Sequence, residues 1–175
     1  MTRRDQTIPG DPFRTWVREV DQNNRVRLPL EIRTVVSWMS VRSGQLECIG
    51  MLGPVGGVQL TPLAMHQEDV RRLTGAVTNT PRPSDSAERW MDAARFLATA
   101  WPMPINIEAN RISITLSEPA RRAQQLPQAG GAVVVFGFGE ILEIWDALKW
   151  HEHVRATARR KDAAISEARE DLAQR

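Results

Sequence analysis

The chain has 175 residues, of which 42% are hydrophobic and 25% charged, a balance typical of a globular protein with one ordinary domain or two small ones. No apolar run is long enough to cross a membrane and the chain begins with a polar stretch, so we expect a cytoplasmic protein without a secretory signal. A single cysteine, Cys48, excludes an intrachain disulfide and a cysteine-based zinc site. The formal net charge is only +2.

Arginine supplies nearly all of the positive charge, since only Lys149 and Lys161 are lysines. Its planar side chain can hold a phosphate or a base edge through two parallel hydrogen bonds, so this bias favours an anionic partner. A GC-rich genome would enrich arginine as well, and composition alone does not separate the two explanations.

Apolar periodicity and turn residues divide the first half of the chain into five expected elements. Val26 and Leu28 alternate with Arg25 and Arg27 after a polar turn, which is the pattern of a β-hairpin. Thr61-Pro62 is typical of a helix start. The expected elements are a hairpin over 14–29, a short amphipathic helix over 30–39, strands at 45–52 and 58–60, and a helix from 61 to about 73.

The second half repeats this order after a polar, turn-rich break. The expected elements are a helix from about 84 to 100, a hairpin over 105–114, a helix over 117–126, strands at 132–138 and 141–145, and a charged helix from Asp146 to the end. The last helix has a narrow apolar seam, consisting of Trp150, Val154, Ala158, Ile165 and Leu172. Such a seam fits either a coiled coil or a solvated, partly frayed helix.

The two halves align with an offset of about 86 residues, which indicates an internal repeat. Residues 24–30 match 110–116, and Gly44 with the run 45–51 matches Gly131 with 132–138. Because each repeat is too small to bury its own sheet, we expect the two repeats to share one core. The predicted division is a flexible arm (1–13), repeat 1 (14–66), a helical insert (67–103), repeat 2 (104–152) and a charged C-terminal helix (153–175).

The pattern Asp21-x-x-Asn24-Arg25-Val26-x-Leu28-Pro29-x-x-Ile32-Arg33 resembles the hairpin-and-helix signature of AbrB-type (SpoVT-AbrB) swapped-hairpin DNA-binding domains. The segment GFGEILEIWDALKWHEH, residues 137–153, is similar to the end of the second repeat of MraZ proteins. The resemblance covers roughly 14–66 and 104–153. It implies an α+β fold with a mainly β core, namely a tandem swapped-hairpin barrel with flanking helices, and homo-oligomers that assemble on double-stranded promoter DNA.

The candidate DNA-binding residues gather around the two hairpin turns. Arg25 and Arg27 have the same strand parity, so both should leave one face, where arginine can bind guanine and asparagine can read adenine. The resemblance implies that the Asp21 to Arg25 turn supports DNA contact. The full candidate set is Arg18, Asp21, Asn23, Asn24, Arg25, Arg27, Arg33, Arg42, Asn110 and Arg111.

The second copy of the motif departs from the first. Ile107 stands at the position of Asp21, Ser113 at that of Arg27, and Thr115 at that of Pro29. We therefore expect the first hairpin to contribute more to DNA binding than the second.

The predicted function is a sequence-specific transcription regulator of the nucleoid, without cofactor or metal. Catalysis is not expected, because the sequence lacks a phosphate-binding loop, a nucleophile elbow and a cysteine-histidine set, and His151 and His153 diverge on a helix. The alternative is a non-catalytic protein-interaction module, antitoxin-like or an assembly subunit, with a protein partner on the C-terminal helix.

Overall fold

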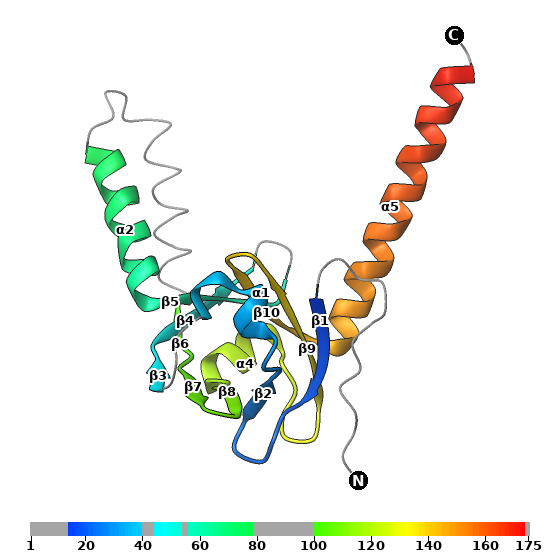
Figure 1. The fold of residues 1–175 in the computed structure, drawn as a ribbon. Coiled ribbons are helices and arrows are strands. Elements are labelled where there is room, and N and C mark those ends of the chain that lie inside the picture. The colour runs from blue at the N-terminus through cyan, green and yellow to red at the C-terminus, as the bar shows by residue number, and fades with distance from the viewer. Residues whose placement is uncertain (1–13, 40–43, 54–55, 79–99, 174–175) are drawn as a thin grey trace.

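Two antiparallel sheets form the body of the protein in the computed structural model, which describes residues 14–39, 44–53, 56–78 and 100–173 (Figure 1). The six-stranded sheet has the order β1 (Arg14–Glu19), β9 (Ala132–Phe138), β10 (Ile141–Asp146), β5 (Val58–Pro62), β4 (Cys48–Leu52) and β6 (Trp101–Pro102). The four-stranded sheet has the order β2 (Arg25–Leu28), β8 (Arg111–Thr115), β7 (Ile105–Glu108) and β3 (Gly44–Leu46). The fold is thus α+β with a mainly β core, and its described strands do not close into a barrel.

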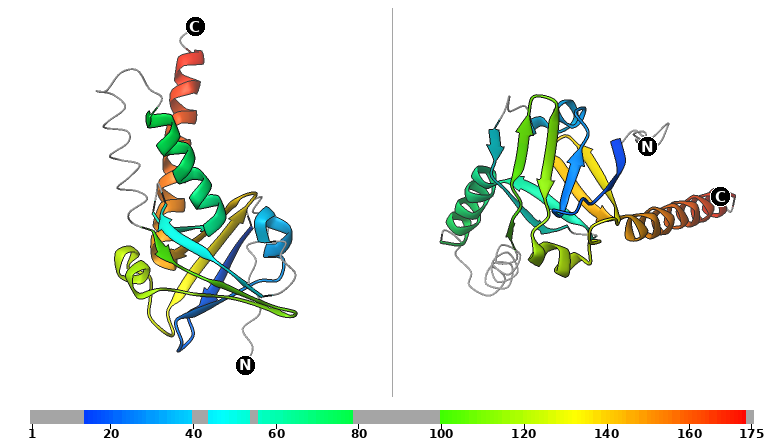
Figure 2. Two further views of the ribbon diagram at one scale, coloured as in Figure 1. Left: turned by 90° about the vertical axis from the view of Figure 1, so that its left-hand side faces the viewer. Right: turned by 90° about the horizontal axis from the view of Figure 1, so that it is seen from below.

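The helices lie between and beyond the strands. They are α1 (Ile32–Val35), the 3-10 helix η1 (Ser37–Met39), α2 (Leu63–Thr78), α4 (Glu118–Gln124) and α5 (Ala147–Ala173). Helices α2 and α5 extend from opposite sides of the body in the same general direction (Figures 1 and 2). None of the described helices is long and apolar enough for a membrane span.

The prediction of a helix start at Thr61 is wrong by two residues, because Thr61 and Pro62 pair with Ile49 and Cys48 as the end of β5. The helix predicted over 30–39 is divided at Val36, which forms an isolated bridge. The predicted arm at 1–13 and most of the helix predicted at 84–100 fall outside the described residues.

The two repeats interleave, because the strands of one repeat pair with strands of the other. Strand β1 pairs with β9, β2 with β8, and β5 with β10. The offset of 86 residues matches Glu19 with Ile105, and it matches Ala132 with Leu46. Glu19 pairs with Ala132 across one sheet, and their matching residues, Ile105 and Leu46, pair with each other across the other sheet. The body therefore has an internal two-fold relation, and the prediction of one shared core is confirmed.

The prediction of a hairpin over 14–29 is wrong in its pairing. Strands β1 and β2 meet only at an isolated bridge between Val20 and Val26, and they then diverge into different sheets. The alternation of apolar residues shows which face of a strand is buried but does not identify its neighbour, and here each neighbour comes from the other repeat. The hairpin of β7 and β8 is confirmed, with Ile105 opposite Ile114.

The glycine that begins β3 and the glycine two residues before β9 correct the repeat alignment by one residue. Gly44 pairs with Ile107. The offset of 86 residues, which the strand pairing supports, matches Gly44 with Gly130 rather than with Gly131. Both Gly44 and Gly130 have positive φ angles, of 122° and 84°. Such backbone angles suit glycine, because a Cβ atom would be strained there.

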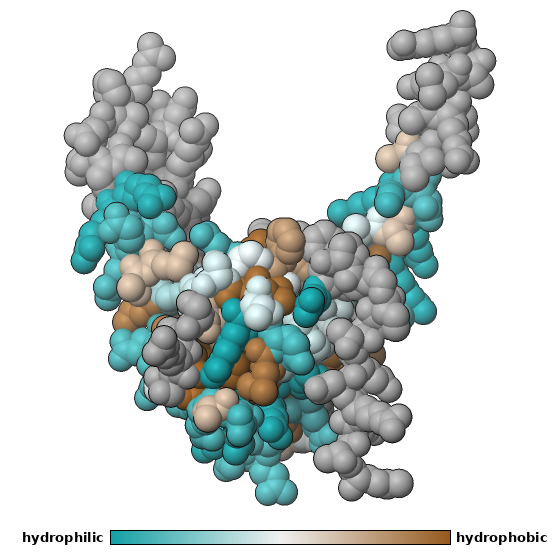
Figure 3. Space-filling view, viewed as in Figure 1, coloured by the Kyte–Doolittle hydropathy of each residue, from teal (hydrophilic) through white to brown (hydrophobic). Residues whose placement is uncertain are grey.

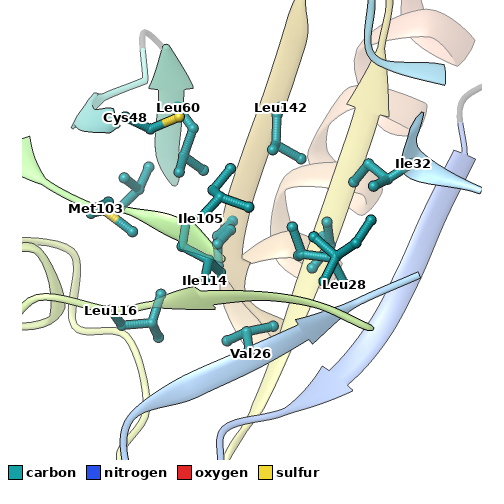
Figure 4. Close-up of a cluster of buried hydrophobic side chains, with 14 of the residues drawn as sticks. Val26, Leu28, Ile32, Cys48, Leu60, Met103, Ile105, Ile114, Leu116 and Leu142 are labelled. Carbon is teal, nitrogen blue, oxygen red and sulfur yellow. The ribbon is translucent and has the colours of Figure 1, made fainter. Parts of the chain in front are cut away.

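The core fills the space between the two sheets with aliphatic side chains from both repeats (Figure 4). Val26 and Ile114 of the four-stranded sheet and Leu60 and Leu142 of the six-stranded sheet are completely buried. Removing such side chains from water stabilises the fold by about 1.5–3 kcal/mol each. The shared core makes each sheet depend on both halves of the chain.

We predict that Ile114→Ala lowers the free energy of unfolding by about 2–5 kcal/mol, because the side chain is fully buried and would leave a cavity. Urea unfolding followed by circular dichroism measures this loss. Ile141→Ala makes the same chemical change at a side chain that is 38% exposed, and it should cost less than about 1 kcal/mol. Separate transitions for the two repeats would contradict the shared core.

Candidate nucleic-acid interface

One face of the four-stranded sheet is polar, and the arginines of β2 lie on it. Arg25 and Arg27 are exposed and alternate with the buried Val26 and Leu28. Residues two apart on a strand are about 7 Å apart and point to the same side. The prediction that the two guanidinium groups leave one face is therefore confirmed.

A row of polar side chains crosses all four strands on this face. Arg27 pairs with Ser113, Ser113 with Asn106, and Asn106 with Gln45. In the next row Arg25 pairs with Thr115. An open cavity of about 320 Å³ lies over these rows, and its lining consists of Arg25, Gly44, Asn106, Ile107, Glu108, Ser113 and Thr115. The cavity thus presents guanidinium, amide and hydroxyl groups, all of which can hydrogen-bond to base edges or phosphates.

The turn before β2 is held together by the side chain of Asp21. Its Oδ1 accepts hydrogen bonds from the backbone N–H groups of Asn23 and Arg25, each at 2.8 Å. Asn24 has a φ of 56°, a conformation that asparagine tolerates better than most residues. Asp21 therefore shapes the turn through backbone contacts, and this places Asn23 at an exposed apex.

The second turn lies at the other end of the same sheet. Arg111 begins β8 opposite Glu108, and Asn110 in the turn before it is exposed. The carbonyl of Asn24 accepts a hydrogen bond from the N–H of Leu116, at the far end of β8. At about 3.4 Å per residue, the two asparagine-bearing turns are about 20 Å apart.

Two of the predicted DNA-binding residues lie elsewhere in the fold, and a third lies outside the described residues. Arg18 is half-buried in β1 of the six-stranded sheet, where its Nη1 donates to the carbonyl of Val17. Arg33 on α1 donates through Nη2 to the carbonyl of Glu108 at 3.1 Å, so it ties the helix to the second turn. Arg42 lies outside the described residues.

Asn106, Ser113 and Thr115 also line the cavity, and none of them is among the predicted DNA-binding residues. In the sequence Ser113 and Thr115 stand out only as departures from the first copy of the motif. A signal was present, because the same period of two that exposes Arg25 and Arg27 also assigns Ser113 and Thr115 to one face of β8. What the sequence did not reveal is that β2 and β8 are neighbours.

We predict that Asp21→Ala destabilises the protein by about 1–2 kcal/mol, because two backbone donors lose their acceptor. Asp21→Asn keeps a side-chain oxygen at the same position and should lose less than half as much. Urea unfolding of the two variants beside the wild type measures both effects. Equal losses would mean that the negative charge, and not the acceptor atom, supports the turn.

Comparison with known proteins adds no relative to this picture. No family model matches the chain, and the search of curated proteins returns no significant match. The polar face consists of three exposed arginines, one exposed glutamate and a row of neutral hydrogen-bonding groups.

Proposed function

We propose that the protein is a sequence-specific DNA-binding transcription regulator of the MraZ and AbrB type, and that the polar face of β2, β8, β7 and β3 is its DNA-binding surface. The observation on which the proposal depends is the gathering of Arg25, Arg27 and Arg111 on one sheet that both repeats build. The interleaved strand order also supports a tandem swapped-hairpin fold, as the resemblance of the Asp21 to Arg33 motif implies.

The dimensions of this face suit a DNA duplex. The arginines of β2 are about 7 Å apart, which is close to two base-pair steps of about 3.4 Å each. The turns at its ends are about 20 Å apart, wider than the major groove of about 12 Å. In the proposed complex Arg25 and Arg27 enter the groove and bind guanine edges, while Asn23 and Asn110 reach the phosphates on either side.

The regulator acts by occupancy, without a cofactor and without catalysis. Its Arg-bearing sheet covers promoter DNA and excludes polymerase, and several copies of the chain multiply weak single contacts into stable binding. This role places the protein in the cytoplasm, on the nucleoid.

A second candidate is a non-catalytic protein-interaction module that keeps the fold but does not bind DNA. The observation that favours it is α5, whose described residues from Val154 to Ala164 are exposed on all sides. The two candidates differ in their response to salt, because phosphate contacts release counterions and apolar interfaces do not.

We predict that the purified protein selects a defined motif from a library of random duplex DNA, and that its affinity for that motif falls steeply with salt. Arg25→Ala and Arg27→Ala should each lower the affinity by about 5- to 100-fold, because each removes a guanidinium group from the groove. Arg111→Ala should lower it less, since Ser113 replaces the second arginine in that repeat. Fluorescence anisotropy with the selected duplex at two salt concentrations measures these affinities.

Arg71→Ala is the matched control, because its side chain is exposed on α2, away from the polar face. It should leave the affinity within about twofold of the wild type. Failure to select any motif, or equal losses for Arg71→Ala and Arg25→Ala, would exclude the polar face as a specific DNA reader.

A further inference from the structure

The two-fold relation between the repeats passes through the middle of the ladder that joins β2 and β8. At the offset of 86 residues Arg27 matches Ser113, and these two residues pair with each other across the ladder. The pairs on either side exchange under the same offset, namely Val26 with Ile114 and Leu28 with Ile112. In an antiparallel ladder such an axis stands perpendicular to the sheet. It therefore leaves the protein through the polar face, between Arg27 and Ser113.

The same relation holds for the ladder that joins β5 and β10 in the other sheet. Residues 58–60 match residues 142–144 at an offset of 84, because the second repeat has a shorter turn before this strand. Gln59 and Glu143 occupy matching positions and pair with each other. Each sheet thus contains one ladder that the axis crosses, so the relation involves the whole body.

The axis gives the polar face two equivalent arginines, Arg25 and Arg111. Both are exposed, and each lies two residues from the axis on its own strand. Because the strands are antiparallel, the two residues lie on opposite sides of the axis, about 14 Å apart along the strands. This separation corresponds to about four base-pair steps of about 3.4 Å each.

The chemistry of the polar face departs from this symmetry in two places. Next to the axis Arg27 is exposed, whereas Ser113 at the matching position is almost completely buried. In the second repeat the exposed Glu108 pairs with Arg111, and the residue that matches Glu108 in the first repeat is the neutral Gln22. A carboxylate repels phosphate groups, so the half of the face that the first repeat builds is more favourable to DNA.

The long helices lie away from this face. Strands β2, β7 and β8 lie at the lower end of the body, and α2 and α5 project from its upper end (Figure 1). The surface at the lower end is mainly hydrophilic (Figure 3). A duplex can therefore approach along the axis without meeting either helix.

We propose that one chain reads a short DNA site with inverted-repeat ends and an asymmetric centre, so that the protein binds its site in one orientation. A duplex with inverted-repeat ends has a two-fold axis perpendicular to the helix, which can coincide with that of the protein. Arg25 and Arg111 then bind the same base on opposite strands, and Arg27 binds a base on one side of the centre. This inference rests on the proposed function, since it specifies the class of DNA that the polar face recognises.

The first test identifies the base pair that each arginine reads. Duplexes that the wild type selects are changed one base pair at a time, and fluorescence anisotropy measures the affinities of the wild type, Arg25→Ala and Arg111→Ala. A change at one end should weaken the wild type by about 5- to 100-fold but Arg25→Ala by less than about twofold. The symmetry-related change at the other end should be silent in the same way for Arg111→Ala. Arg71→Ala on α2 is the matched control and should respond as the wild type does at both ends.

The second test determines the orientation of the bound chain. Cys48 is buried, and burial raises the pKa of its thiol to about 12, so a thiol-directed reagent should react only with a cysteine placed on the surface. An iron chelate that generates hydroxyl radicals is attached to Gln22→Cys in the exposed first turn, and it should cut the DNA mainly on one side of the site. Attached to Ala109→Cys in the exposed second turn, it should cut mainly on the other side.

A more symmetric variant tests the cause of this orientation. Arg27→Ser with Glu108→Gln removes both differences between the halves of the face, and it leaves the backbone carbonyl of Glu108 to accept from Arg33. In the Gln22→Cys background the ratio of cutting on the two sides should fall from at least about fivefold to within about twofold. Arg71→Ser with Glu68→Gln makes the same chemical changes on α2 and should leave the ratio unchanged.

Several results would overturn the inference. A selected motif without inverted-repeat ends would do so, as would a single base pair whose change is silent in both Arg25→Ala and Arg111→Ala. Equal cutting on both sides by the labelled wild type would contradict binding in one orientation, and so would a ratio that the symmetric variant leaves unchanged. Failure to select any motif would overturn the proposed function itself, whereas a specific motif without inverted-repeat ends would contradict this inference alone.

Discussion

The pairing of β2 with β8 is the constraint on which the rest of the structure depends. These strands come from different repeats, and their inward side chains, Val26 against Ile114 and Leu28 against Ile112, are almost completely buried. The same ladder fixes the outward side chains, so Arg25 and Arg27 face the same way as Ser113 and Thr115. Core and polar face are therefore two sides of one set of backbone hydrogen bonds, and neither exists in one repeat alone.

The two repeats have equivalent positions in the fold but different surface chemistry. The first contributes two exposed arginines to β2, whereas the second contributes one arginine and two small hydroxyl residues to β8. The inward positions of β2 and β8 are apolar in both copies, since Val26 and Leu28 match Ile112 and Ile114 and all four are buried. The outward positions differ: Arg27 is exposed, whereas Ser113 at the matching position is almost completely buried.

Much of the local structure could be predicted from the sequence, because periodicity, caps and turn residues act over short distances. The helix starts at Ser117 and Asp146 are confirmed, and Asp146 accepts hydrogen bonds from the N–H groups of Leu148 and Lys149. Strand partners that are distant in sequence could not be predicted, since the pairing of β1 with β9 is not encoded near either strand. For the same reason the sequence predicts a DNA-binding hairpin, although the structure forms the polar face from strands of both repeats.

The interleaved topology also affects how the chain folds as it is synthesised. Glu19 and Ala132, the paired residues of β1 and β9 that are nearest in sequence, are separated by 113 residues. Likewise β2 cannot pair until β8 has been synthesised. At about 5–20 residues per second, the first strand leaves the ribosome about 6–20 s before its neighbour is made. During that interval the apolar edge of the first repeat has no native partner, so nascent chains on the same messenger RNA could exchange strands. The interleaved topology therefore joins both halves of the chain in one core, but it leaves the first repeat without its native partners until late in synthesis.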